Sequence, residues 1–96
     1  MQIILKREFD EDLKKDWCQL EKKNNLIIFQ TYKWNENWIK FNKIEYMVMI
    51  FIVYDNNEPI AIFPFYKQKK FFFNILRWIG NDASDYPGPI IDSNYF

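Results

Sequence analysis

Apolar residues in the middle of the chain form two runs that flank a short polar stretch. The runs cover residues 46–54 and 60–63, and both are rich in β-branched and aromatic side chains. Asn56 and Asn57, between them, tolerate the left-handed backbone of a tight turn, so the pattern predicts a β-hairpin over residues 46–67. Because the first run is apolar at successive positions, we expect helices to cover both faces of this sheet.

The segment before the hairpin has apolar residues at helical spacing. Asp10 is a suitable N-cap and acidic residues follow it, which predicts a helix from residue 11 to about Lys23. The apolar positions of this helix are Leu13, Trp17 and Leu20. Residues 2–9 predict a short strand, and its pairing with residues 46–54 could be parallel or antiparallel.

A second helix is predicted after the polar break at residues 24–25. Thr31 is a suitable cap for a helix that ends near residue 42. Its apolar residues again share helical spacing: Trp34, Trp38 and Phe41. A helix this short is marginal alone, so we expect its tryptophans to pack on the sheet. Trp34 is also a candidate for stacking on a substrate.

The residues after the hairpin predict a third strand. Pro64 cannot donate to a ladder, which predicts a bulge or the end of regular pairing between Phe63 and Phe65, and so a kink in the second strand. Residues 67–70 are charged and predict a turn, and residues 71–80 return as a strand. Together these elements predict an α+β fold in a single domain over residues 1–96, with two helices packed on an antiparallel meander of three to five strands.

A polar, turn-rich segment follows this strand over residues 80–89. Loops at strand ends often carry catalytic or binding residues, and this one contains two carboxylates, a hydroxyl and a phenol within five residues. The candidate site residues are Asp82, Ser84, Asp85 and Tyr86. The alternative is an ordinary solvated turn, in which Asp82 only caps the backbone.

Composition excludes several kinds of site. The chain has no His and a single cysteine, Cys18, so it offers no zinc site, catalytic triad or intramolecular disulfide. Its 13 basic and 13 acidic residues balance, which argues against a nucleic-acid partner. No apolar run approaches the ~20 residues that span a bilayer, and no signal peptide is recognisable. We therefore expect a cytoplasmic protein with no membrane partner.

Short motifs spread over about residues 13–92 resemble one family of transferases. In chain order they are Trp17 and Leu20, then Phe29-Gln30-Thr31 with Trp34 and Trp38, then Ile60 to Phe65, then Leu76-Arg77 with Gly80, and finally Ser84-Asp85-Tyr86 with Pro89-Ile90. Their order and spacing are similar to those of the N-terminal half of CelD-like acetyltransferases. These enzymes are relatives of the FemAB-type aminoacyl transferases, and the resemblance implies the N-terminal half of a GNAT-like fold.

The resemblance also implies a reaction, the transfer of an acyl group from a thioester such as acetyl-CoA to an amine or hydroxyl of a small-molecule or glycan acceptor. This chain would be the acceptor-side part of an incomplete domain, which a C-terminal GNAT half or a second polypeptide completes. Asp85 and Tyr86 would be catalytic, while Ser84, Asp82 and Trp34 would bind the acceptor. Because the glycine-rich pyrophosphate loop of GNAT proteins is missing, we expect the isolated chain to bind no cofactor and to be inactive.

Two other functions compete with the transferase interpretation. One is a non-enzymatic interaction module that binds a protein through an open sheet edge and exposed aromatic residues. The other is a single-strand nucleic-acid binder built on residues 67–78, which the balanced charge disfavours.

Overall fold

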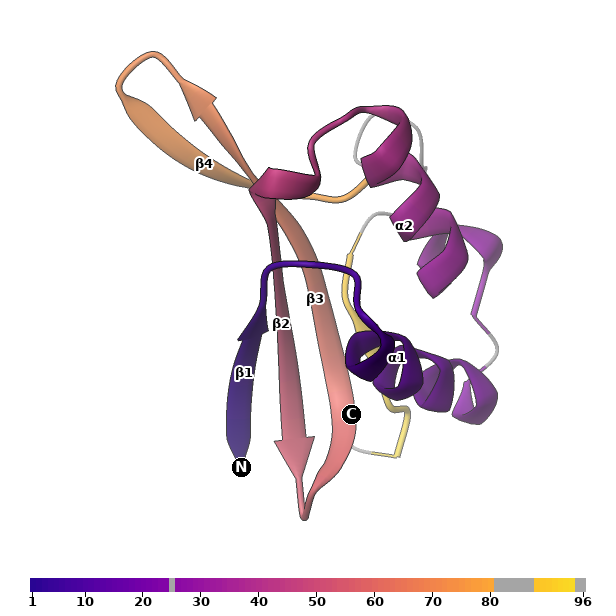
Figure 1. The fold of residues 1–96 in the computed structure, drawn as a ribbon. Coiled ribbons are helices and arrows are strands. Elements are labelled where there is room, and N and C mark those ends of the chain that lie inside the picture. The colour runs from indigo at the N-terminus through magenta and orange to yellow at the C-terminus, as the bar shows by residue number, and fades with distance from the viewer. Residues whose placement is uncertain (25, 81–87, 95–96) are drawn as a thin grey trace.

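The computed structural model describes residues 1–24, 26–80 and 88–94. These residues form an α+β fold, with two α-helices and a five-stranded antiparallel sheet (Figure 1). The elements in chain order are β1 (Gln2–Lys6), α1 (Glu11–Lys23), the short 3₁₀ helix η1 (Ile28–Gln30), α2 (Tyr32–Phe41), the 3₁₀ helix η2 (Glu45–Met47), β2 (Val48–Asp55), β3 (Glu58–Lys70), β4 (Phe73–Trp78) and β5 (Ile90–Ile91). The predicted fold class is confirmed.

The sheet has the order β1-β2-β3-β4, and β5 also pairs with β3. β1 runs antiparallel to β2, which resolves the pairing that the sequence left open. β4 pairs with the second half of β3, while β5 pairs with Ala61 and Ile62 in its first half. Because β2 occupies the other side of β3, β4 and β5 are two stretches of one interrupted edge.

Pro64 lies where this edge is interrupted. Its carbonyl accepts a hydrogen bond from the amide of Ile79 at 2.9 Å, but its ring nitrogen has no proton to donate in return. The β4 ladder accordingly ends at the pair of Phe65 and Trp78, whereas pairing with β2 continues through the proline. The predicted end of regular pairing is therefore confirmed on the side of β4 and is wrong on the side of β2.

Of the two turns predicted in the meander, one is confirmed and one is wrong. Between β2 and β3, Asn56 and Asn57 have φ values of 51° and 65°, which confirms the predicted tight turn. The turn predicted at residues 67–70 is wrong, because these residues continue β3 and the chain reverses at Phe71 and Phe72. This hairpin projects beyond the helices (Figure 1), so Lys69 and Lys70 are exposed without leaving the strand.

α1 forms as predicted. The Asp10 carboxylate accepts a hydrogen bond from the Leu13 amide at 2.8 Å and caps the first turn. The three predicted apolar positions, Leu13, Trp17 and Leu20, are fully buried. They form the helix's side of the core.

α2 begins after the predicted cap, Thr31, but buries a different face. Phe41 is 86% exposed, and the buried residues are Tyr32, Asn35 and Ile39. The side-chain amide of Asn35 donates to the carbonyls of Phe29 and Thr31, at 3.1 and 2.8 Å. A satisfied polar residue thus occupies a core position, and a pattern of apolar residues could not detect it.

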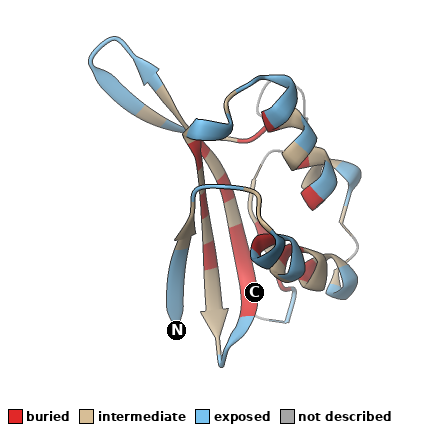
Figure 2. Ribbon diagram, viewed as in Figure 1, coloured by how far each residue is buried: buried red, intermediate tan, exposed pale blue. Residues whose placement is uncertain are grey.

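Both helices pack on the same face of the sheet (Figure 2). The sheet contributes alternate positions to this core: Val48, Ile50, Ile52, Ile62 and Tyr66. Helices were expected on both faces, and this is wrong for the described residues. The unbroken apolar run in β2 reflects a second apolar face that no described helix covers.

Candidate functional site

Most of the loop that was predicted to carry the site lies outside the described residues. Asp82, Ser84, Asp85 and Tyr86 lie outside the described residues. Trp34, the fifth predicted site residue, packs against Gly80, where that loop begins: a Cβ added to Gly80 would lie 2.5 Å from Cη2 of the indole. The structure therefore brings α2 to the start of the loop.

Four aromatic side chains form a cluster on the sheet face opposite the helices. This cluster, called the aromatic face below, consists of Phe51, Phe63, Phe65 and Trp78. The ring centroids of Phe65 and Trp78 are 4.4 Å apart, and the Phe63 ring lies 6.5 Å from Phe65 and 6.4 Å from Trp78. All four side chains are only partly buried, and none belongs to the core beneath the helices.

The strand register extends the aromatic face with aliphatic residues. Leu5 is opposite Phe51, and Met49 is opposite Phe65. Directly opposed residues of an antiparallel pair share a face, so both side chains lie beside the rings. None of these side chains is charged, and contiguous apolar surfaces of this kind mark interaction sites.

Sequence reasoning missed this surface, although a signal was present. In β2 and β3 the two sets of alternate positions differ in kind. The core positions are mainly aliphatic, as at Ile50, Ile52 and Ile62, whereas the opposite positions include the three phenylalanines Phe51, Phe63 and Phe65. Separating aromatic from aliphatic residues by strand parity would have distinguished the two faces.

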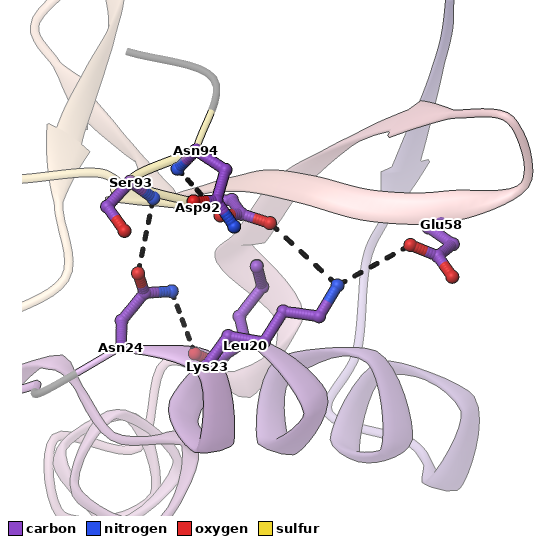
Figure 3. A network of polar contacts seen from close by, with 7 residues as sticks. All are labelled: Leu20, Lys23, Asn24, Glu58, Asp92, Ser93 and Asn94. Carbon is purple, nitrogen blue, oxygen red and sulfur yellow. Dashed lines mark hydrogen bonds and ion pairs between the residues drawn. The ribbon is translucent and has the colours of Figure 1, made fainter.

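Lys23 joins the end of α1 to the C-terminal segment (Figure 3). Its ammonium lies 3.8 Å from the carboxylate of Asp92 and 3.5 Å from that of Glu58. Asp92 is 2% exposed, and its carboxylate also accepts a hydrogen bond from the Asn94 amide at 3.0 Å. A buried carboxylate with these partners is satisfied within the fold and holds β5 in place.

Asn24 makes a second connection in the same region (Figure 3). Its side chain donates to the Leu20 carbonyl at 2.9 Å and accepts from the Ser93 amide at 3.2 Å. It therefore ends α1 and fixes the segment after β5 with one amide group. We assign a structural role to this network, not a catalytic one.

A groove of about 270 Å³ between α1 and α2 is lined in part by Cys18. Burial raises the pKa of the Cys18 thiol, and the neighbouring Glu21 carboxylate raises it further. A thiol that stays protonated at neutral pH is a poor nucleophile. The groove is therefore no candidate for covalent catalysis.

Tyr54 connects β2 to α1 through a hydrogen bond that its hydroxyl donates to the Asp16 carboxylate. Burial and this bond raise the pKa of Tyr54, so the phenol remains protonated over the physiological range. The contact anchors the helix to the sheet and offers no proton relay at neutral pH.

Comparisons with known proteins give no relative for this chain: no family model, curated protein or solved structure matches it. In the part of the chain that the structure describes, no group of three or more His, Cys, Asp or Glu side chains could hold a metal ion. None of the helices formed by residues 1–24, 26–80 and 88–94 is long and apolar enough to cross a membrane.

Proposed function

We propose that this chain is a protein-interaction module and that its aromatic face packs against the same face of a second copy. The observation that carries the proposal is the cluster of Phe51, Phe63, Phe65 and Trp78 on a sheet face that no described helix covers. Sheets with an apolar face are stable when a second layer buries it, and two such faces pack about 10 Å apart.

Surface and charge both favour a second copy as the partner. The accessible surface is 6509 Å², whereas a monomer of 11.9 kDa exposes about 5900 Å² by the usual scaling with mass. None of the side chains of the aromatic face is charged, so packing two copies against each other there would bury no ionic group. Short chains commonly gain stability by oligomerisation, because one small core provides little.

Sedimentation equilibrium of the wild-type chain and two variants tests this proposal. Phe65→Ser removes a ring from the centre of the aromatic face, whereas Phe41→Ser removes a ring that is 86% exposed on α2. We expect wild type and Phe41→Ser to self-associate over about 1–100 µM, and Phe65→Ser to remain monomeric. A wild-type chain that is monomeric throughout, or equal association of all three, would refute the proposal.

A second candidate function is the acceptor side of an acyltransferase that acts in the cytoplasm on a thioester donor. The contact between Trp34 and Gly80 favours it, because it brings a predicted acceptor-binding ring to the start of the predicted catalytic loop. The test is to express any longer reading frame that continues past Phe96 and to compare acetyl-CoA binding by calorimetry. Binding by the longer product alone supports this function, and binding by neither product argues against it.

For that candidate, Asp85→Asn in the longer product should lower transfer with little loss of stability, since Asp85 would orient or deprotonate the acceptor. Asp55→Asn is a matched control, because Asp55 is the last residue of β2 and adjoins the β2–β3 turn instead of the predicted loop. Unchanged transfer by Asp85→Asn would assign the loop to structure.

A further inference from the structure

Three consecutive phenylalanines form the tip of the β3–β4 hairpin. Phe71, Phe72 and Phe73 are 83%, 97% and 70% exposed. The hairpin projects away from the helices, and its tip is exposed throughout (Figures 1 and 2). Phe71 and Phe72 are the turn residues and Phe73 is the first residue of β4, so the three rings lie together at the end of the hairpin. An environment that surrounds the end of the hairpin would cover all three.

The backbone of this turn is unusual for its residues. Phe71 has a φ of 56°, a left-handed conformation that turns normally reserve for Gly, Asn or Asp. Keeping a bulky aromatic residue there costs stability, and its ring gains nothing from the protein's own core because it is exposed. The ring at this position therefore needs an explanation outside the isolated fold.

The charge around the tip has one sign. Residues 59–81 contain Lys67, Lys69, Lys70 and Arg77 and no Asp or Glu. Lys67 and Lys69 also line a groove of about 510 Å³ that reaches Phe72 at the tip. The balanced charge of the whole chain conceals this local concentration of positive charge.

We propose that the tip inserts its phenylalanines into the interface of an anionic lipid membrane while the lysines behind them bind the headgroups. Aromatic and basic residues side by side are the combination that favours membrane interfaces, where rings lie at the acyl boundary and ammonium groups stay in the headgroup layer. The sequence predicted no membrane partner because no run could span a bilayer. Insertion of a hairpin tip does not require a spanning run.

Vesicle co-sedimentation tests the proposal with the whole chain. Vesicles of phosphatidylcholine are compared with vesicles in which about a third of the lipid is phosphatidylserine. We expect binding to the anionic vesicles only, weakened by salt and reduced about tenfold or more in the double variant Lys69→Gln, Lys70→Gln. The matched control is Lys15→Gln, Lys22→Gln, which removes two exposed lysines from α1 and should bind as wild type does.

The variant Phe71→Gly distinguishes a loss of vesicle binding from a loss of folding. Glycine adopts a positive φ without strain, so this variant should be at least as stable as wild type in urea, yet bind anionic vesicles several-fold more weakly. Phe72→Trp should report insertion as a blue shift and as quenching by brominated lipid. Phe41→Trp, on an exposed residue of α2, should show neither response.

Two results would overturn the proposal. One is an absence of binding to anionic vesicles, or binding that Phe71→Gly leaves unchanged. The other is tip-dependent binding to a single-stranded oligonucleotide or to a second copy with no binding to vesicles, which would give the tip a macromolecular partner instead of a lipid surface.

Discussion

Phe65 of β3 and Trp78 of β4 lie with their ring centroids 4.4 Å apart on the face of the sheet that the described helices leave uncovered. They are the last residue pair of the β3–β4 ladder, next to the point where β4 gives way to the loop. The contact joins the aromatic residues of β3 and β4 into one partly exposed surface. It is the basis of the interaction function proposed above.

Leu20→Ala should lower the free energy of unfolding by about 2–5 kcal/mol, because it opens a cavity at a fully buried position between α1 and the sheet. Urea unfolding measures the change. Phe41→Ala is the control, with an expected change below about 0.5 kcal/mol, since the Phe41 ring is 86% exposed. Equal losses in both variants would contradict the assignment of the core.

Gly80→Ala should destabilise the chain by about 1–3 kcal/mol for two reasons. The new Cβ would lie 2.5 Å from Cη2 of Trp34, and the φ of 79° disfavours any side chain. In a Trp34→Ala background the steric part of the loss should disappear and the backbone part should remain. A double-mutant cycle with no coupling energy would show that the two residues do not touch.

Lys43→Gly should stabilise the chain by about 0.5–1 kcal/mol. Lys43 follows α2 with a φ of 56°, and the Ile44 amide bonds back to the Ile39 carbonyl at 3.3 Å, which is the geometry of a helix end that favours glycine. The midpoint of urea unfolding should rise. Lys40→Gly, inside the same helix, should lower it.

Asp10 should make stability depend on acidic pH. Partial burial acts to raise the pKa of Asp10, but hydrogen bonds from the Leu13 amide and the Lys6 ammonium outweigh it and hold the pKa below its ordinary value. A depressed folded-state pKa adds stability above the unfolded-state pKa, and this contribution is lost as pH falls through the folded-state value. Wild type should therefore lose stability on acidification.

Asp10→Asn keeps a capping oxygen and removes the titrating group. The stability difference between wild type and this variant, measured in urea, should shrink as pH falls from about 7 to about 2. If this stability difference stayed constant with pH, the charge of the Asp10 carboxylate would add nothing to the stability that a neutral cap provides.

Several features that depend on local rules were predicted correctly from the sequence. The Asp10 cap, the spacing of Leu13 and Trp17, and the turn at Asn56 are local, and all three are confirmed. The buried face of α2 was missed because its key position, Asn35, is polar and is satisfied by carbonyls that only the fold brings near it.

The candidate site was less predictable for a different reason. An apolar run shows that both faces of a strand avoid water, but not whether the same chain covers both of them. Only the parity of Phe51, Phe63 and Phe65 against the aliphatic core positions distinguishes the faces, and the strand register is needed to place the rings of β2 and β3 side by side. Of the five predicted site residues, the structure describes only Trp34, which packs against Gly80.

Isotope-filtered nuclear Overhauser spectroscopy on a mixture of labelled and unlabelled chains tests the central claim most directly. Association through the aromatic face predicts contacts between copies from the rings of Phe65 and Trp78, and their loss in Phe65→Ser. Contacts between copies that come only from Phe71 to Phe73 or from the β1 edge, or no such contacts at concentrations where the chain is fully folded, would contradict it.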